Sequence, residues 1–172
     1  MQRIAVDMDG VLADVVDRFL EWDERDHGVR QTIEQVSGRT EQEAFPFVRK
    51  YVYTPTFFRG LKVMPDSKEV LAELNARYDV FIVSAATEFP QSLAEKQEWL
   101  TEHFPFITWQ QIVFCGSKKI IQADIMIDDL FKNLDHFQGH SSLLFDQPHN
   151  ARADAGRHRR VYNWKEIASI LL

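Results

Sequence analysis

The chain has 172 residues, of which 45% are hydrophobic and 27% are charged, and its formal net charge is -6. This length fits one domain with a small insertion, and the composition is that of an ordinary globular protein rather than a disordered one. The negative charge argues against a surface for nucleic-acid polymers, because such surfaces need basic side chains that displace counterions.

The first predicted element is a short apolar strand over residues 4–6, directly before the acidic stretch DMDG. The segment that follows, residues 14–65, contains no convincing strand. We predict one helix from about Asp14 to Gly28 and a second that begins near Thr40 with a capping box. The second half of this segment is rich in aromatic residues, which favours a small helical unit packed over another surface: Phe45, Phe47, Tyr51, Tyr53, Phe57 and Phe58.

From residue 66 onward, amphipathic stretches alternate with short apolar runs, which is typical of strand–helix–strand units around a parallel sheet. The runs are continuously apolar, so both faces of the sheet should be covered. Further strands are predicted over residues 79–84, 112–115, 125–127 and 143–145. Helices are predicted from a capping pair at Asp66 and Glu69, from Pro90 to near Pro105, over 130–137 and over 164–172.

These elements predict an α/β fold. Its core is a Rossmann-like parallel sheet formed by residues 1–13 and 66–172. A small helical cap, residues 14–65, is inserted after the first strand. The basic cluster at residues 157–160 is expected to be a solvated turn or strand edge, because runs of charge usually are.

Four of the predicted strands have polar side chains at or just beyond their carboxyl ends. These side chains are the pair Asp7 and Asp9, then Ser84, Lys118, and the pair Asp128 and Asp129. Ligands of open α/β sheets bind outside the carboxyl ends of the strands, so these side chains should meet at one edge. Taken singly, each has an ordinary explanation as a turn residue, a helix cap or solvated surface. Their combination at successive strand ends favours a functional site.

The charges of this group indicate what it binds. Four carboxylates beside one lysine leave a formal excess near -3, which a partly dry cleft holds only with a cation or by protonation. Mg2+ prefers oxygen ligands and commonly uses one or two carboxylates together with a substrate phosphate oxygen. A lysine and a hydroxyl can hold the remaining phosphate oxygens. The pattern predicts Mg2+-dependent phosphoryl transfer.

At this point the sequence resembles a known family. DMDGVLAD, Ser84, Lys118 and the IDD at 127–129 are similar to the four motifs of the haloacid dehalogenase superfamily of phosphohydrolases. Further stretches resemble its 5'(3')-deoxyribonucleotidase branch over nearly the whole chain: FFRGLKVMP (57–65), EKQEWL (95–100), ADIMIDD (123–129), LFDQPHN (144–150) and YNWKEI (162–167). The resemblance implies an enzyme that hydrolyses phosphate from (deoxy)ribonucleoside monophosphates.

The resemblance also implies residue roles. Asp7 would be the nucleophile that forms an aspartyl-phosphate. Asp9 would protonate the leaving nucleoside oxygen and then activate the water that hydrolyses the intermediate. Ser84 and Lys118 would bind the phosphoryl group. Mg2+ would be held by the Asp7 carboxylate, the Asp9 carbonyl and Asp129. Asp128 would support these ligands or act as an alternative ligand.

The cap would select the leaving group. Its aromatic residues either stack on a nucleobase or form the core of the cap, with Tyr53 and Phe58 the better pocket candidates. Val15 stands where the better-known animal relatives carry a phenylalanine, and Ala85 where they carry a serine. These two positions are therefore also candidates for the substrate pocket.

Three alternatives remain at this stage. A phosphatase of the same superfamily could act on a sugar phosphate or another small phosphomonoester. A signalling receiver combines acidic residues, a hydroxyl and a lysine, but carries its acidic pair early and the phosphorylated Asp on a later strand. A catalytically idle nucleotide-binding protein is the third alternative, although all four motif positions are retained.

The expected partner is a small nucleotide substrate, and a homodimer is an alternative to a monomer. The single cysteine, Cys115, excludes an internal disulfide framework and suits a reducing compartment. No secretory signal precedes the first strand, and the apolar stretch 80–86 is far shorter than the roughly 20 residues that cross a bilayer. We therefore expect a soluble, cytoplasmic protein without a membrane partner.

Overall fold

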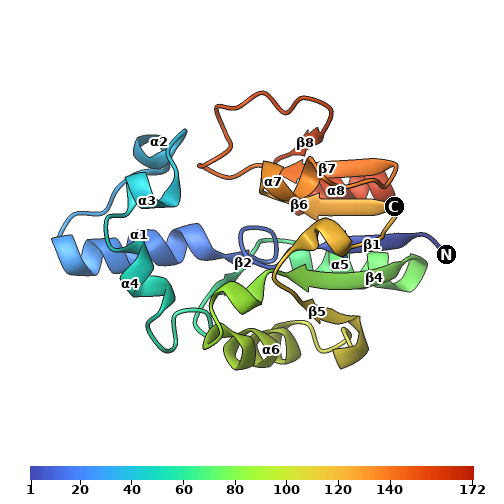
Figure 1. The fold of residues 1–172 in the computed structure, drawn as a ribbon, viewed down its shortest axis with the longest axis horizontal. Coiled ribbons are helices and arrows are strands. Elements are labelled where there is room, and N and C mark those ends of the chain that lie inside the picture. Colours follow the sequence, from blue (N-terminus) through green and yellow to red (C-terminus); the bar gives the residue numbers. More distant parts are fainter.

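Strand β1 lies in the middle of a six-stranded parallel sheet, and the strand order is β5-β4-β1-β6-β7-β8. The computed structural model describes residues 1–172 (Figure 1). The strands are β1 (Arg3–Val6), β4 (Asp79–Ser84), β5 (Ile112–Phe114), β6 (Ile125–Asp128), β7 (Ser141–Phe145) and β8 (Arg159–Val161). Because β1 is central, its carboxyl end adjoins those of β4 and β6.

Alternate residues of each strand enter two separate cores. Ile4 and Val6 belong to a large hydrophobic cluster on one face, whereas Ala5 belongs to a smaller cluster on the other. This separation follows from the two-residue period of a strand, whose side chains point alternately to opposite faces. Both faces are covered, as the continuous apolar runs predicted.

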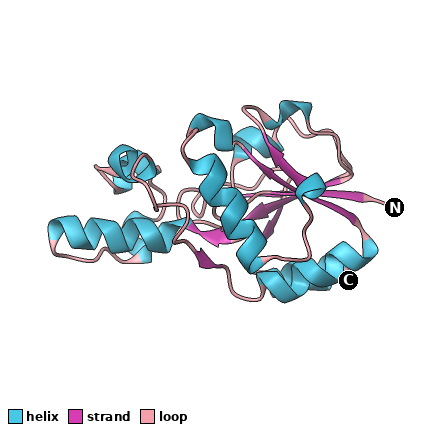
Figure 2. Cartoon of the chain, turned by 90° about the horizontal axis from the view of Figure 1, so that it is seen from below, coloured by secondary structure: helices cyan, strands magenta, loops and turns pink.

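Helices cover these faces unequally (Figure 2). Helices α5 (Ser67–Arg77), α6 (Ser92–His103) and α8 (Trp164–Leu171) contribute to the large cluster. The short α7 (Phe131–Leu134) contributes to the small one. One-turn 3-10 helices, η1 (Ala86–Glu88), η2 (Trp109–Gln111) and η3 (Lys118–Ile120), complete the connections. No helix in the chain combines the length and apolar character that crossing a bilayer requires.

A helical segment projects from the carboxyl side of the sheet, on the left of Figure 1. It contains α1 (Val15–His27), α2 (Ile33–Val36), α3 (Glu41–Ala44) and α4 (Val48–Val52). The chain enters it through β2 (Ala13–Asp14) and returns through β3 (Lys62–Val63), and these two short strands pair antiparallel. Entry and return therefore lie side by side.

Local sequence signals explain the ends of α1. The Asp14 carboxylate caps its amino end by accepting a hydrogen bond from the Asp17 amide at 3.0 Å. Gly28 ends the helix with φ of 79°, a left-handed conformation that glycine adopts without strain. The side chains of Phe19 and Trp22 then pack against Phe57 with ring centroids 5.2 Å apart.

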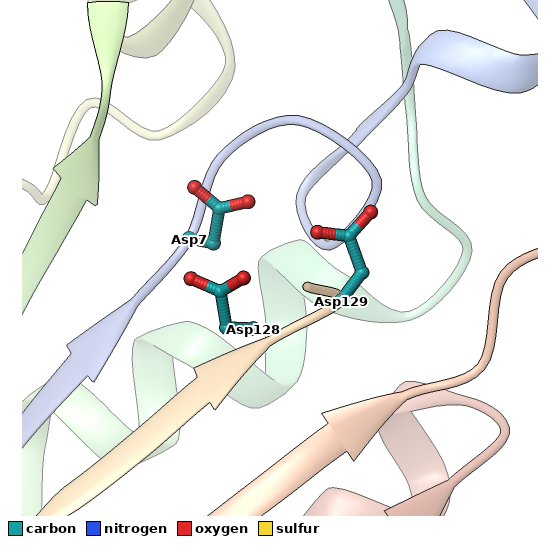
Figure 3. A group of neighbouring side chains, drawn as sticks. All are labelled: Asp7, Asp128 and Asp129. Atoms are coloured by element: carbon teal, nitrogen blue, oxygen red, sulfur yellow. The ribbon is translucent and has the colours of Figure 1, made fainter. Parts of the chain in front are cut away.

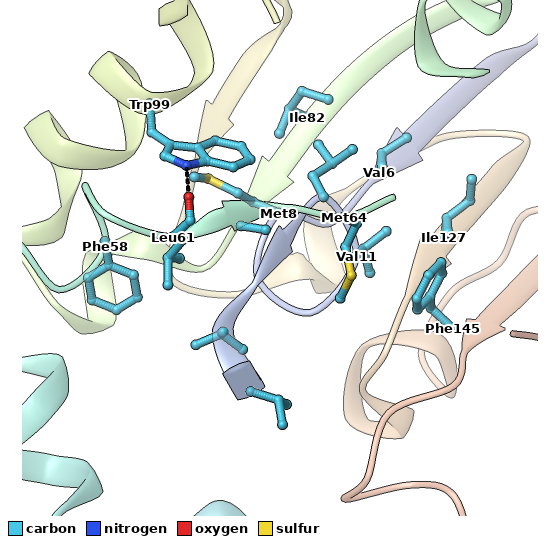
Figure 4. Close-up of a cluster of buried hydrophobic side chains, with 14 of the residues drawn as sticks. Val6, Met8, Val11, Phe58, Leu61, Met64, Ile82, Trp99, Ile127 and Phe145 are labelled. Carbon is cyan, nitrogen blue, oxygen red and sulfur yellow. Dashed lines mark hydrogen bonds between the residues drawn. The ribbon is translucent and has the colours of Figure 1, made fainter. Parts of the chain in front are cut away.

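Hydrophobic packing is continuous between this helical segment and the sheet (Figure 4). Trp99 of α6 is fully buried there, and its indole N–H donates to the Leu61 carbonyl at 2.8 Å. The Glu95 carboxylate accepts hydrogen bonds from the backbone amides of Thr56 and Arg59 at 2.6 and 3.0 Å. Helix α6 thus fastens the returning chain to the core.

The predicted strands and long helices are present, but several local predictions were wrong. Asp66 has a left-handed φ of 62° and makes no side-chain capping bond, so α5 begins without the predicted cap. Helix α7 spans only four residues, because the Arg157 guanidinium binds the carbonyls of Leu134, Asp135 and Phe137. The basic cluster lies at a strand edge, one of the two expectations for it: Arg159 and Arg160 belong to edge strand β8, and His158, directly before this strand, is buried.

Replacing Trp99 with Phe should lower the free energy of unfolding by about 2–4 kcal/mol. The substitution removes the donor to the buried Leu61 carbonyl and leaves a cavity. Urea unfolding followed by circular dichroism measures the change. Trp109→Phe is the matched control, since Trp109 is 74% exposed and its loss should cost less than about 0.5 kcal/mol. Equal effects of the two substitutions would contradict the assignment.

Candidate active site

Three aspartates converge where β1 and β6 end (Figure 3). The Asp7 amide donates to the Ile127 carbonyl at 2.9 Å, which holds the end of β1 beside β6. Carboxylate oxygens of Asp7, Asp128 and Asp129 lie within 4.8 Å of one another, and all three residues are buried. The parallel sheet therefore concentrates negative charge at one edge.

A buried lysine lies against this cluster. The Lys118 ammonium is 2.5 Å from Asp7 Oδ1 and 2.7 Å from Asp128 Oδ2. Asp128 also accepts hydrogen bonds from the Leu130 amide at 2.9 Å and from Asn133 Nδ2 at 3.0 and 3.1 Å. Both oxygens of Asp128 are thus occupied by protein donors, whereas Asp129 accepts no hydrogen bond from a lysine.

A second lysine completes the site. Lys96 of α6 is 2% exposed, and its ammonium lies 2.5 Å from Asp9 Oδ2 and 3.2 Å from Ser84 Oγ. The same nitrogen lies 4.4 Å from the centre of the Phe58 ring. The other Asp9 oxygen, Oδ1, is buried and has no hydrogen-bond partner.

The sequence contained a signal for Lys96 beyond its place in the EKQEWL stretch. Lys96 lies three residues after Leu93 and three before Trp99, so helical spacing places it on the apolar face of α6. It also changes the charge balance, because four carboxylates now face two lysines rather than one. The formal excess is two negative charges instead of about three, which one divalent cation would neutralise.

Gly10 allows the two acidic segments to approach each other. Its φ is +80°, and a Cβ atom at this position would lie 2.4 Å from Asp129 Oδ2. Any side chain here would therefore displace the Asp129 carboxylate as well as strain the backbone. The glycine of the DMDG stretch is thus required both by the turn and by the close approach of Asp129.

Burial and mutual repulsion shift the pKa values of the cluster. Burial, opposed by Lys118 and reinforced by Asp128 and Asp9, raises the pKa of Asp7 to about 7. Burial and the charges of Asp7 and Asp128 raise the pKa of Asp129 well above its usual value. Burial disfavours the charged form of Lys118, but the two carboxylates outweigh it and raise its pKa. Ionising Asp7 and Asp129 together therefore requires a further positive charge.

A cavity of about 690 Å³ opens above these groups, between the sheet edge and the helical segment. Asp7, Asp9, Ser84, Lys118 and Asp129 line its inner end. The four residues predicted from the sequence as substrate-pocket candidates also line it: Val15, Tyr53, Phe58 and Ala85. Asp128 is the one predicted site residue outside the cavity wall.

The aromatic residues of the helical segment divide into two groups. Phe45 and Phe57 are buried and pack against Phe19, so they form the core of the segment. Tyr53 and Phe58 line the cavity, and both rings pack against Phe89. The core explanation thus applies to Phe45 and Phe57, and Tyr53 and Phe58 stay candidates for the substrate pocket.

The helical segment also contributes a charged residue that sequence reasoning missed. Glu41, the first residue of α3, lines the cavity and forms no ion pair. Burial, together with Asp9 and Glu88, raises the pKa of Glu41 to about 7. The capping box located the start of α3, but the face that α3 turns to the cavity depends on tertiary packing.

The architecture is similar to that of solved haloacid dehalogenase-like hydrolases. A haloacid dehalogenase-like family hydrolase from Streptococcus pneumoniae aligns over 100% of this chain and 99% of its own, with a TM-score of 0.65 and 13% identity. A haloacid dehalogenase family hydrolase from Deinococcus radiodurans aligns over 99% and 97%, with a TM-score of 0.61 and 16% identity. These likenesses confirm the predicted fold, which is the one that haloacid dehalogenase-type hydrolases adopt.

Closer relatives define the branch. A family model described as "5' nucleotidase, deoxy (Pyrimidine), cytosolic type C protein" matches residues 1–172. The 5'(3')-deoxyribonucleotidase of Bacillus subtilis is 40% identical over 178 residues, which cover 98% of each chain. The chain belongs to the 5'(3')-deoxyribonucleotidase family. It is a phosphomonoester hydrolase, as its motifs predicted.

The raised pKa of Asp7 predicts a pH-dependent response to Mg2+. In the absence of metal this pKa moves from 3.8 to about 7 on folding, so the folded state retains a proton that the unfolded state has released. Through this group, the free energy of unfolding decreases as pH rises between those values. Bound Mg2+ favours the ionised carboxylates, so it should raise the melting temperature more at pH 7.5 than at pH 5.

Thermal unfolding with EDTA or with Mg2+ at the two pH values measures this difference, which we expect to be a few degrees. Asp129→Asn serves as the control, because loss of this carboxylate should abolish the Mg2+ response at both pH values. A Mg2+ response that is equal at both pH values, or larger at pH 5, would contradict the pKa assignment.

Proposed function

We propose that the protein removes phosphate from nucleoside monophosphates, with deoxyribonucleotides as preferred substrates, in a Mg2+-dependent reaction. The observation that carries this proposal is the buried set of carboxylates and lysines that opens into a cavity with aromatic walls. The name of the Bacillus subtilis relative, 5'(3')-deoxyribonucleotidase, supports the substrate class.

Residues 1–13 and 66–172 act as the catalytic core, and residues 14–65 act as the cap. The pairing of β2 with β3 at the junction supports this division, because the chain leaves and re-enters the core at one place. The cap closes the cavity over the phosphate and excludes water from the reacting atoms.

In the first step, Asp7 is the nucleophile. One of its carboxylate oxygens attacks the phosphorus and forms an O–P bond, while the bond between phosphorus and the nucleoside oxygen breaks. Asp9 gives a proton to the departing oxygen. Lys118, 2.5 Å from Asp7 Oδ1, favours the ionised nucleophile and lies close enough to neutralise the transferring phosphoryl group. Ser84 donates a hydrogen bond to the same group.

In the second step, Asp9 takes a proton from a water molecule whose oxygen attacks the phosphorus. The bond between Asp7 and phosphorus breaks, which releases inorganic phosphate and restores Asp7. The geometry of Asp9 supports this exchange, because Lys96 engages Oδ2 and leaves Oδ1 without a protein partner. Lys96 therefore orients the carboxyl that carries the proton.

Mg2+ would be held by the carboxylates of Asp7 and Asp129 and by the Asp9 carbonyl oxygen. This donor set consists of oxygen atoms, as Mg2+ prefers, and the Asp9 carbonyl accepts none of the chain's hydrogen bonds. Asp128 acts as a support rather than a ligand, because Lys118, Asn133 and the Leu130 amide occupy its oxygens. A bound divalent cation neutralises charge on the phosphoryl oxygens. A haloacid dehalogenase hydrolase of Bacillus subtilis has been solved bound to magnesium.

The nucleoside leaves through the part of the cavity lined by the cap. Tyr53 and Phe58 offer flat faces for a nucleobase, and stacking of this kind contributes about 1–3 kcal/mol. Val15 and Ala85 are small, so they leave room beside the sugar. We also assign the enzyme to the cytoplasm, where the unpaired thiol of Cys115 is stable.

Asp7→Asn should abolish phosphate release, with a loss of about a thousandfold or more, because an amide does not form the acyl phosphate. Release of inorganic phosphate under saturating Mg2+ measures the effect, and circular dichroism verifies the fold. Asp66→Asn is the matched control. Asp66 lies outside the cavity in a left-handed conformation that asparagine tolerates, so activity should be unchanged. Substantial activity in Asp7→Asn would remove Asp7 from the nucleophile's role.

A substrate panel tests the nucleotide assignment. We expect dUMP and dTMP to be hydrolysed with kcat/KM at least about tenfold above that of sugar phosphates, because only nucleotides present a base to the aromatic wall. Tyr53→Ala should narrow this ratio while leaving turnover of sugar phosphates unchanged. Equal or better turnover of sugar phosphates would replace the proposal with the sugar-phosphate alternative.

A further inference from the structure

One loop contacts both chain segments that supply the proposed metal ligands. We refer to residues 146–150, between β7 and β8, as the clamp loop. Asn150 Nδ2 donates to the Asp129 carbonyl at 2.9 Å, and His149 Nε2 lies 3.0 Å from the same oxygen. Gln147 Nε2 donates to the Gly10 carbonyl at 2.6 Å. The clamp loop thus holds the segment of Asp7 and Asp9 against the segment of Asp129.

The clamp loop approaches one proposed ligand atom, since His149 Nε2 lies 3.4 Å from Asp129 Oδ2, and its two amide side chains leave the ligand atoms free. Asn150 and Gln147 bind backbone carbonyls rather than carboxylates, and both side chains are buried away from the cavity. Because Asp129 Oδ2 would lie 2.4 Å from a Cβ at Gly10, a small shift of either segment changes the spacing of the metal ligands. Of the clamp loop only His149 lines the cavity, so Gln147 and Asn150 affect the geometry of the metal site from outside the cavity wall.

One arginine braces the clamp loop with four hydrogen bonds, beside the loop's own bond from the Gln147 amide to Asn150 Oδ1 at 3.3 Å. The guanidinium of Arg160, on β8, donates to Asp146 Oδ1 at 2.5 Å and to Asn150 Oδ1 at 2.7 Å. It also donates to the carbonyls of Asn150 and Ala153 at 3.1 and 2.7 Å. By binding Oδ1 of Asn150, Arg160 orients the amide so that Nδ2 points to Asp129.

We propose that Arg160 is a positioning residue for the metal site: through Asn150 and the clamp loop it sets the spacing between the Asp7–Asp9 segment and Asp129, and thereby the affinity for a divalent cation. This inference rests on the metal site of the proposed function. Partners that orient metal ligands typically change metal affinity 10- to 100-fold when they are removed. Arg160 contacts neither the ligands nor the cavity, so its effect is transmitted through the backbone of Asp129.

A purely structural role makes a different prediction. If Arg160 only anchored the edge strand β8, its removal would lower the melting temperature and leave Mg2+ affinity unchanged. If Arg160 positions the metal ligands, the folded variant binds Mg2+ more weakly. A lysine at position 160 retains the positive charge but lacks the planar guanidinium that binds Asp146 and Asn150 together. It should therefore retain only part of the affinity for Mg2+.

The experiment is calorimetric titration of Mg2+ alone into the full-length protein, with folding verified by circular dichroism. We expect Arg160→Met to weaken Mg2+ binding at least about tenfold, and Arg160→Lys by less. Arg159→Met is the matched control: Arg159 is an exposed neighbour on the same strand and should bind Mg2+ like the wild type. If Arg160→Met fails to fold, Asn150→Ala takes its place with the same expectation.

Two results would overturn the inference in distinguishable ways. Wild-type affinity in a folded Arg160→Met or Asn150→Ala variant would refute the positioning role and leave the proposed function intact. Absence of Mg2+ binding by the wild type would instead refute the proposed metal site, and the positioning role with it. Saturating Mg2+ should restore kcat in the variants, because the reacting groups themselves are unchanged.

Discussion

The meeting of four carboxylates, three of them buried, with two buried lysines is the interaction on which the structure of this protein depends. Asp7, Asp9, Asp128 and Asp129 share the sheet edge with only Lys96 and Lys118 to balance them. Burying such a group is unfavourable unless every charge is paired. Burial, which Lys118 only partly offsets, raises the pKa of Asp7 to about 7, so a further positive charge would favour its ionised form.

The architecture serves this requirement. A parallel sheet brings the carboxyl ends of β1, β4 and β6 together, so residues far apart in the sequence contribute to one site. Helix α6 contributes twice, since it supplies Lys96 to the site and fastens the returning chain through Trp99 and Glu95. The helical segment and the charged groups of the site are thereby held by the same helix.

The sequence predicted those elements that depend on local pattern. The strands before Asp7 and Asp128 were visible because buried parallel strands are continuously apolar. Strand β8 was not among the predicted strands, because its three residues include two arginines and only one apolar side chain, that of Val161. Strands β2 and β3 have two residues each, too few to show a period. These strands exist because of pairing, which is a tertiary effect.

The same distinction applies to the site. Motif spacing selected the acidic residues, Ser84 and Lys118 as candidates, because each stands at the end of a strand or after a short turn, and all of them except Asp128 line the cavity. The contribution of Lys96 to the charge balance depends on how α6 packs on the sheet, and that of Glu41 on the placement of α3. The role inferred for Arg160 depends on four hydrogen bonds to residues 146–153, which no spacing rule encodes.

The most direct test of the account is to identify the residue that becomes phosphorylated during turnover. Acid quenching of the enzyme with its nucleotide substrate, followed by peptide mapping with mass spectrometry, would locate a phosphoryl group carried as an acyl phosphate. The account predicts that it is on Asp7 and that it is absent when Mg2+ is chelated before mixing. A phosphoryl group on any other residue would contradict the account.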